Sequence, residues 1–302
     1  MSRRDRRVHL VDGTYELFRQ FYGQPERGAT AGTDVRAALG VAGSLVSMIA
    51  GGATHLGVAT DHVIESFRND LWPSYKTSAG VPEELLAQFG VLEILVEALG
   101  IKLWPMVELE ADDAMASAAH VAASDPGVEQ VVICTPDKDL AQCVAGARVV
   151  QLDRRKGTVA DENAVWAKFG VSPSSIPDWL ALVGDSADGF PGIAGWGKQS
   201  ASGVLSFYGH IDEIPDDAEA WDPAVRRAVR GAPKLATRLA EQRDLANLFL
   251  DLATLRVDPT LLASTDELAW EGPTGALGEV CEQLGAPALA RRAESISPRS
   301  IH

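Results

Sequence analysis

Cysteine is scarce in this 302-residue sequence, which contains only Cys134, Cys143 and Cys281. These residues form neither a Cys-x-x-Cys pair nor another zinc-binding spacing, so the sequence disfavours a disulfide framework and predicts a reducing compartment. A secretory leader is also lacking, because the charged residues at the start lead directly into the short apolar run from Val8 to Val11. We therefore expect a cytoplasmic protein.

One stretch, Ala37 to Thr60, is uncharged apart from a possible proton on His55, and its length raises the question of a membrane span. Its glycines and serines argue against a span. The pair Gly51-Gly52 would end a helix, and the residues from His55 to Thr60 would then form a strand. The sequence predicts a buried helix followed by a buried strand, without membrane contact.

Positive charge is in deficit, with 27 Lys and Arg residues against 42 Asp and Glu residues and a formal net charge of −15. Lys and Arg normally supply the affinity of a protein for phosphate groups, so this balance disfavours binding to a polyanion through overall charge. Local charge must decide whether phosphate groups can bind.

Apolar residues make up 46% of the sequence, which is enough for one large core or two modest ones, and the composition shows no mark of disorder. In residues 1–171, short β-rich runs alternate with helical stretches such as Pro82 to Leu99 and Asp112 to Ala123. This alternation predicts a doubly wound α/β domain, with a mostly parallel sheet flanked by helices. The predicted strands are Arg7–Val11, His55–Thr60, Ile101–Met106, Gln130–Thr135 and Arg148–Leu152.

Residues 172–302 show a different pattern, with short helices separated by Pro and Gly. We predict a smaller helical region here, with one strand candidate at Thr254–Val257. The acidic, Pro-interrupted segment Asp212–Asp222 is typical of a surface loop, whereas Lys234–Leu250 is predicted to form an amphipathic helix.

Acidic residues follow three of the predicted strands. Asp12 follows the first strand, Asp61 follows the second, and Asp137 and Asp139 follow the run Val131 to Cys134. A single Asp in such a place is commonly a helix N-cap. Ligands bind beyond the carboxyl ends of strands in an open parallel sheet, so the recurrence at three strand ends indicates a site.

Two further acidic segments favour metal binding. The run Glu108–Asp113 packs four carboxylates into six residues at the start of a predicted helix, where ordinary helix-start chemistry alone could account for acids. Such a cluster is repulsive unless cations compensate for it, and oxygen ligands are what magnesium and manganese prefer. The Gly-rich turn Gly184–Gly189 adds two more acids.

Taken in order from Val8 to Tyr208, these pieces resemble the 5′ nuclease family, which includes flap endonucleases and the 5′ nuclease domain of bacterial DNA polymerase I. The resemblance implies a PIN-like catalytic domain over 1–171. It also implies a helix and three-turn-helix element at about 183–208, with C-terminal helices that pack back on the core. The matching motifs are Val11-Asp12-Gly13, Asp61 with Ser66-Phe67-Arg68, Tyr75-Lys76, Glu110-Ala111-Asp112-Asp113, Thr135–Leu140 and Gly184–Gly197.

The resemblance also implies a centre with two Mg²⁺ or Mn²⁺ ions. One ion would lie near the acids of the first two strands and the other near those after the fourth, with Asp112 between them. If the nine acids that the resemblance assigns to the metal centre are set aside, 33 acidic residues remain against 27 basic ones. Bound cations would partly offset this milder excess. The implied ligands are Asp12, Asp61, Glu110, Asp112, Asp137, Asp139 and Asp188, with Asp113 and Asp185 assisting through water or at the second ion.

Several residues match the family's contacts to DNA. Lys76 corresponds to a lysine that touches the scissile phosphate, and Phe18 to an aromatic residue on which the terminal base stacks. Arg19 and Arg68 are candidate phosphate contacts, and Arg68 is counted with the catalytic residues. Core packing for Phe18 and a solvated surface role for Lys76 are the alternatives.

The segment from Pro191 to Gly197 resembles the family's glycine-rich loop, which presents backbone amides to duplex phosphate and often helps to bind K⁺. Three departures predict a weaker hold on DNA. Gln199 stands where a lysine is usual, an arginine is missing after Lys76, and the acidic turn ends in Gly189 rather than asparagine. The predicted contacts of the loop are Gly192, Gly195, Gly197, Lys198 and Gln199.

The function expected from this resemblance is a standalone, monomeric 5′ nuclease that cuts DNA at 5′ flaps, nicks and 5′ ends during replication or repair. A PIN-like ribonuclease and a noncatalytic nucleic-acid-binding paralogue are the alternatives. The nine acids argue against the second, because loss of catalysis would remove the chemical reason to hold so many carboxylates together.

Overall fold

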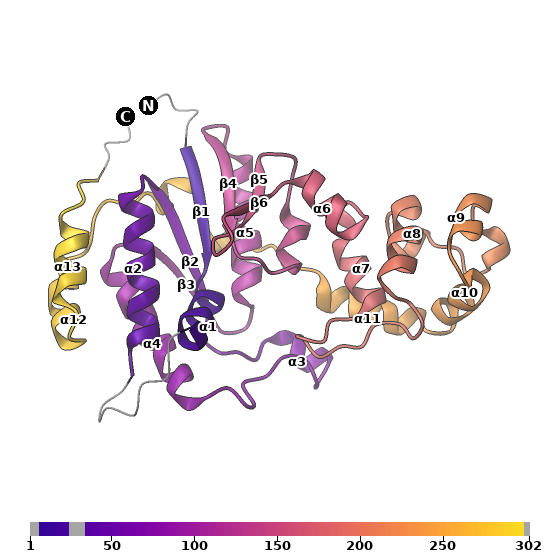
Figure 1. Ribbon diagram of the computed structural model, residues 1–302, viewed down its shortest axis with the longest axis horizontal. Coiled ribbons are helices and arrows are strands. Elements are labelled where there is room, and N and C mark those ends of the chain that lie inside the picture. Colours follow the sequence, from indigo (N-terminus) through magenta and orange to yellow (C-terminus); the bar gives the residue numbers. More distant parts are fainter. Residues whose placement is uncertain (1–5, 24–33, 299–302) are drawn as a thin grey trace.

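The computed structural model describes residues 6–23 and 34–298, and its centre is a six-stranded sheet with the order β3-β2-β1-β4-β5-β6 (Figure 1). All neighbours are parallel except β5 and β6, so the predicted α/β fold with a mostly parallel sheet is confirmed. The sequence did not reveal β6, which has only three residues and no apolar alternation. The strands are β1 (Arg6–Asp12), β2 (His55–Asp61), β3 (Lys102–Met106), β4 (Val128–Cys134), β5 (Val149–Asp153) and β6 (Thr158–Ala160).

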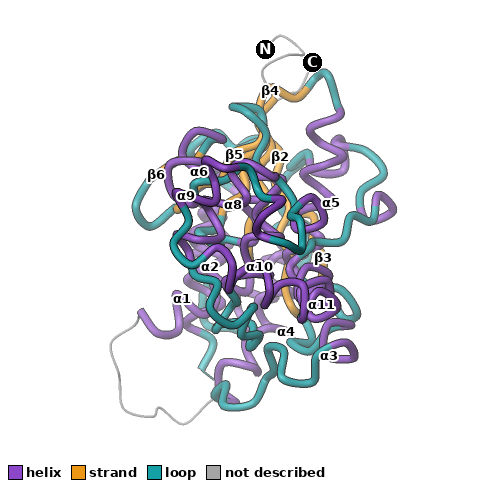
Figure 2. Tube along the Cα trace, turned by 90° about the vertical axis from the view of Figure 1, so that its right-hand side faces the viewer, coloured by secondary structure: helices purple, strands orange, loops and turns teal. Residues whose placement is uncertain are grey.

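Helices cover both faces of the sheet. Leu10 on β1 packs toward helix α5, while Val11 packs toward helices α2 and α4, because successive side chains of a strand point to opposite faces. In Figure 2 the strands lie between α2 on one side and α5 on the other. Both faces of the sheet are therefore shielded from water, which explains the nearly continuous apolar runs of the strands. The helices of this domain are α1 (Gly13–Gly23), α2 (Arg36–Ala50), α3 (Phe67–Leu71), α4 (Glu83–Ala98) and α5 (Ala111–Ser124).

The uncharged stretch forms a helix and a strand, as predicted. Helix α2 ends at Ala50, Gly52 has a φ of +105°, and the chain then enters β2, whose residues are all buried. Among the described residues, no helix is long and apolar enough to cross a membrane.

A second hydrophobic core lies in the helical region at the other end of the molecule (Figure 1). Buried aromatic residues such as Trp179, Trp221 and Phe249 contribute much of its volume. The helices that surround it are α6 (Glu162–Phe169), α7 (Ile176–Val183), α8 (Lys198–Tyr208), α9 (Pro223–Ala228), α10 (Ala232–Glu241) and α11 (Arg243–Ala253).

Three predictions for this region were wrong in detail. The helix expected over Lys234–Leu250 is two helices, because the chain breaks at Gln242, next to Arg243, which donates hydrogen bonds to the carbonyls of residues 211 and 214. Residues 254–257 form no strand, since the Arg256 N–H is used to bind Asp113. The predicted surface loop at 212–222 contains two short 3₁₀ turns and buries Trp221, although its acids from Asp212 to Glu219 are exposed.

Helices α12 (Leu277–Gln283) and α13 (Pro287–Glu294) return to the domain that contains the sheet. They pack beside α4 and α2, and Cys281 and Ala293 are buried in the same core as Val11. Arg292 also donates a hydrogen bond of 2.9 Å to the Ser47 hydroxyl on α2.

Candidate metal centre

The parallel sheet brings the predicted acids to one edge. Strands β1, β2 and β4 are neighbours that run in the same direction, so Asp12, Asp61 and the loop that carries Asp137 and Asp139 lie at their shared carboxyl end. Helix α5 begins at the same edge and adds Asp112. The edge therefore concentrates negative charge in a way that a single helix cap would not.

Four of the predicted acids accept hydrogen bonds from donors far away in the sequence, and we call them the bonded group. Asp12 accepts from the Tyr15 N–H at 2.7 Å and from the Thr135 hydroxyl at 2.9 Å. Asp61 accepts from the Ala111 N–H at 2.8 Å. These bonds fix the side-chain directions before any ligand binds. The bonded group consists of Asp12, Asp61, Glu110 and Asp113.

Arg68 is buried beneath the bonded group and binds it through hydrogen bonds. Its guanidinium is 1% exposed and makes two hydrogen bonds of 2.8 Å to the Asp113 carboxylate, while Nε donates to the Leu252 carbonyl at 2.8 Å. Asp113 also accepts from the Glu110 N–H at 2.9 Å. The predicted phosphate contact by Arg68 is therefore wrong, because burial and these bonds keep its charge away from DNA. Its role is to position Glu110 and Asp113.

Lys76 lies beside the bonded group, as a lysine that handles phosphate would. Its ammonium is 3.4 Å from Glu110 Oε2 and 3.6 Å from Asp61 Oδ2, and the Ser66 hydroxyl donates to the other Glu110 oxygen at 2.7 Å. Burial would lower the pKa of Lys76, but the attraction of Asp61 and Glu110 outweighs it and raises that pKa well above its usual value. Lys76 therefore stays charged.

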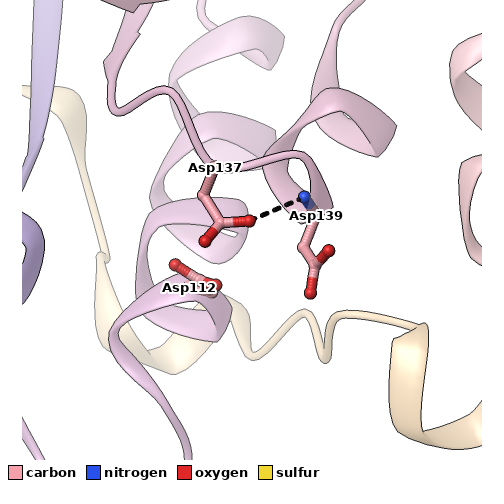
Figure 3. Close-up of side chains that lie close together, drawn as sticks. All are labelled: Asp112, Asp137 and Asp139. Atoms are coloured by element: carbon pink, nitrogen blue, oxygen red, sulfur yellow. Dashed lines mark hydrogen bonds between the residues drawn. The ribbon is translucent and has the colours of Figure 1, made fainter. Parts of the chain in front are cut away.

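Five other acids lie close to one another, and we call them the open group. In the described part of the chain, the only hydrogen bonds that they accept come from backbone N–H groups two residues further on, to Asp137 and Asp185. One oxygen each of Asp112, Asp137 and Asp139 lies within 4.8 Å of the others, and the same holds for Asp139, Asp185 and Asp188. Figure 3 shows the first three pointing toward a common space, with the Asp139 N–H donating to Asp137. Asp139 is common to both clusters. The open group consists of Asp112, Asp137, Asp139, Asp185 and Asp188.

Crowding and burial change the titration of these acids. Burial raises the pKa of Asp188 to about 7, with a further contribution from Asp185, and burial likewise raises the pKa of Asp12 to about 7. Burial and the charge of Asp137 raise the pKa values of Asp112 and Asp139 well above their usual range. The cluster is therefore unfavourable as a set of bare anions, and bound cations would stabilise it.

The chain supplies one cation that the sequence did not single out. Lys138 forms an ion pair with Asp185, and its ammonium is 3.9 Å from Asp139. Burial would lower the pKa of Lys138, but Asp139 and Asp185 outweigh burial and raise it. The sequence signal was present, since Lys138 stands between two acids of the same motif.

The segment that carries Lys76 is hydrogen-bonded to the acidic turn, residues 184–189. The Lys76 N–H donates to the Asp188 carbonyl at 3.0 Å, and Trp72 Nε1 donates to the Gly189 carbonyl at 3.1 Å. Gly189 has a φ of +82°, and a Cβ atom on it would collide with the Ser74 carbonyl oxygen. Glycine in place of the family's asparagine thus allows two backbones to meet here.

The glycine-rich loop between α7 and α8 borders the open group. Gly192 has a φ of +69°, and a Cβ atom there would collide with the backbone of residues 182–184, so only glycine permits this packing. A groove of about 660 Å³ runs along the acidic turn, with Lys138 and Asp185 among its lining residues and Lys198 at the start of α8. Lys198, Gln199, Gly195 and Gly197 are exposed there.

Phe18 and Arg19, the two predicted DNA contacts on α1, lie in different environments. Phe18 is half-buried and its ring lies edge-on to Phe89, with centroids 6.3 Å apart, so core packing accounts for it. Arg19 forms an ion pair with the buried Glu16 and keeps about a third of its side chain exposed. Neither residue touches the acidic edge through any contact in the described part of the chain.

The acidic edge fits divalent cations. Its donors are hard carboxylate oxygens. Within the described residues two of them, Asp139 Oδ1 and Asp185 Oδ2, are buried without a hydrogen-bond partner, although Asp185 Oδ2 forms an ion pair with Lys138. An α/β sheet with such an edge has the ligand chemistry that hard divalent cations prefer.

The sequence matches the model of the 5′-3′ exonuclease N-terminal resolvase-like domain over residues 7–170 and that of the 5′-3′ exonuclease C-terminal SAM fold over residues 171–276. The chain belongs to the 5′-3′ exonuclease family. The resemblance drawn from its motifs is thereby confirmed.

Two relatives illustrate the range of this family. The chain is 33% identical over 269 residues to DNA polymerase I of Pseudomonas aeruginosa, which covers 86% of the chain but 28% of that polymerase. It is 31% identical over 236 residues to a 5′-3′ exonuclease of Aquifex aeolicus, which covers 78% of the chain and 81% of the relative. The chain thus spans little more than a quarter of the polymerase.

Solved structures show the same fold. The bacteriophage T5 D15 protein, co-crystallised with metal ions, superposes with a TM-score of 0.66 at 16% identity, covering 96% of this chain and 98% of that one. The catalytic core of Rad2 in complex with a DNA substrate gives 0.61 at 16% identity, covering 97% and 91%. The predicted fold class is confirmed, including the second, helical region.

Proposed function

We propose that this member of the 5′-3′ exonuclease family is a nuclease that uses two divalent cations, Mg²⁺ or Mn²⁺, to hydrolyse DNA at 5′ flaps, nicks and 5′ ends. The observation that carries the proposal is the open group, where five carboxylates converge and one buried oxygen of Asp139 lacks a donor within the described residues. Folding alone gives no reason for such a cluster.

The open group would hold the cations. One ion would be held by Asp112, Asp137 and Asp139, and the other by Asp139, Asp185 and Asp188. This assignment makes Asp139 the shared ligand, where the sequence pattern suggested Asp112. When bound, such cations stabilise charge on a phosphoryl group and activate water for attack on it.

The bonded group and Lys76 would orient the substrate. Asp61 and Glu110 hold the Lys76 ammonium near the acidic edge, where a charged amine attracts a phosphate oxygen. The link between the Lys76 N–H and the Asp188 carbonyl keeps this amine at a fixed distance from the open group. The protein thereby aligns a phosphodiester with the cations rather than merely attracting it.

The glycine-rich loop would hold the duplex beside the cut. Gly192 and Gly195 both have positive φ angles, and the groove between the acidic turn and Lys198 leads from the loop to the open group. A K⁺ ion at this loop is part of the proposal. The solved relatives support the substrate class, since one of them is the T5 D15 flap endonuclease in a complex with DNA and metal ions.

Cleavage of labelled substrates tests this function. Single-flap, nicked, blunt and RNA-containing duplexes with a 5′ label are offered with magnesium or manganese, and the products are mapped. We expect cleavage of the flap and nick that leaves a 5′-phosphate. Preference for the RNA strands would indicate a ribonuclease, and binding without cleavage under all conditions would indicate a noncatalytic paralogue.

A matched pair of variants ties cleavage to the site. Asp188→Asn removes one open-group charge, whereas Asp244→Asn removes the same charge from an exposed position on α11. We expect only Asp188→Asn to abolish metal-dependent cleavage, with duplex binding retained. Equal activity of the two variants would contradict the proposed site.

A further inference from the structure

One segment of this acidic chain is uniformly basic. Residues 226–238 contain five Arg and Lys residues and no acid, in a sequence with a net charge of −15. Arg226 forms an ion pair with Glu219, while the other four are exposed. We call these four residues the basic strip: Arg227, Arg230, Lys234 and Arg238.

The side chain of Arg238, on α10, packs against the glycine-rich loop. Its NH1 donates a hydrogen bond of 3.0 Å to the Ala194 carbonyl, although the residues are 44 positions apart. Gly195 has a φ of +88°, and a Cβ atom on it would collide with the Arg238 guanidinium. The loop therefore leaves room for this guanidinium, and glycine at 195 is what allows it.

The rest of the strip continues away from the loop. Lys234 lies four residues before Arg238 on α10, so the two side chains share one face of the helix. The Lys234 ammonium makes no ion pair or side-chain hydrogen bond within the described part of the chain. Lys198 begins α8 immediately after the loop. Positive side chains thus stand on both sides of the glycine-rich loop.

We propose that Arg238 and Lys234 form a surface that binds the phosphate backbone of double-stranded DNA, continuous with the glycine-rich loop. This surface supplies contacts that the chain lacks at Gln199, where the family usually has a lysine. The inference rests on the proposed function, since it extends the duplex-binding side of that site. A guanidinium with one N–H donated to a carbonyl keeps further donors for a phosphate, and the bond to Ala194 fixes its direction.

The charge of the surface favours duplex DNA. Glu241, one turn beyond Arg238, is the nearest acid along α10, and the residues from 226 to 238 contribute only positive charge. A contact to the backbone from a helix face carries no base specificity, so the surface would position the duplex without selecting a sequence. It lies at the end of the molecule that carries α8 and α10, away from α13 (Figure 1).

Salt-dependent binding to nicked duplex DNA, measured in EDTA so that no cleavage occurs, tests this surface. Lys234→Gln and Arg238→Gln are compared with Arg291→Gln, which removes an exposed arginine from α13 at the opposite end. Each strip variant is expected to reduce the slope of log affinity against log salt by about 0.9 for each phosphate that it no longer neutralises, and to weaken binding about fivefold to tenfold near 0.1 M salt. The control is expected to match the parent protein.

Two further measurements separate DNA contact from a role in folding. Lys234→Gln removes no ion pair or side-chain hydrogen bond within the described protein, so its thermal stability should stay unchanged while its salt slope falls. Arg238→Lys keeps the charge and should retain most of the slope.

Specific outcomes would overturn the inference. An unchanged slope for Lys234→Gln and Arg238→Gln, or an equal change for Arg291→Gln, would show that the strip does not contact DNA. If the parent protein bound duplex with the expected slope differences but cut no substrate, the surface would stand and the proposed nuclease function would fail.

Discussion

The bonded group and the open group differ in what holds them, although they share one edge of the sheet. Asp12, Asp61 and Asp113 receive hydrogen bonds from backbone and side-chain donors, and Arg68 neutralises Asp113. The open group has Lys138 as its main protein counter-charge, and in the described part of the chain its other donors are two backbone N–H groups, to Asp137 and Asp185. The difference teaches that folding alone can position the first group, whereas we expect the second to require bound cations.

Removing the shared carboxylate should have the largest effect. Asp139→Asn is expected to lower the cleavage rate about 10²- to 10³-fold, because the variant loses a metal-centred stabilisation of transition-state charge worth several kcal/mol. In metal-free buffer the same change should raise the melting temperature, since it relieves repulsion with Asp137 and Asp188. A lower melting temperature there would place Asp139 in the bonded group instead.

A substitution in the bonded group should lower the stability of the protein, which is the opposite of the effect expected for Asp139→Asn in metal-free buffer. Asp113→Asn leaves the Arg68 charge buried without its partner, and breaking such a pair costs about 3–5 kcal/mol. We expect that loss in the free energy of unfolding measured with urea, with or without magnesium. The double variant Asp113→Asn with Arg68→Met should recover part of it. An unchanged unfolding curve for the single variant would contradict the assigned role of Arg68.

The pH dependence of metal binding sharpens the contrast further. The pKa of Asp188 is raised from about 4 to about 7, so the stability that this group gives the metal-free protein is present at low pH and falls away as pH rises toward 7. Cations bind the deprotonated acids. The increase in melting temperature on adding magnesium should therefore grow between pH 5 and pH 8. A gain that is independent of pH would argue against the raised pKa values.

A change in the contact between the Lys76 segment and the acidic turn should have the smallest effect. Gly189→Asn forces the turn away from Ser74 and shifts Lys76 relative to Asp188, so we expect turnover to fall about tenfold, or about 1.4 kcal/mol, with little change in duplex affinity. Gly146→Asn is the control, because Gly146 also has a positive φ but its Cβ would meet open space. Equal losses in both variants would mean that backbone strain, not the contact with Ser74, is responsible.

The sequence predicted those parts of the fold and site that depend on local pattern. Strand ends followed by Asp12, Asp61 and Asp137 indicated the acidic edge, because parallel neighbours share their carboxyl ends. The helix break at Gln242 was missed, since it depends on Arg243 binding carbonyls about thirty residues away.

Residues that act through distant partners could not be assigned from the motifs. Arg68 stands in a family motif beside Phe67, and its charge suggested a phosphate contact. Its burial depends on the Leu252 carbonyl, which is 184 residues further along the chain. The contact of Arg238 with Ala194 likewise depends on how α10 packs against the loop. Motif order is informative about acids that share an edge, but the orientation of long basic side chains requires the tertiary structure.

The return of α12 and α13 to the sheet also constrains the order in which the molecule can assemble. The core around Val11 is closed by Ala293, so its two ends are separated by nearly the whole length of the chain. The helical core instead draws mainly on residues between 141 and 253, which are closer together in sequence. Loop closure is less costly for the shorter separation. During synthesis the helical region can therefore form first, while the layer of helices over the sheet is sealed only after α13 has been made.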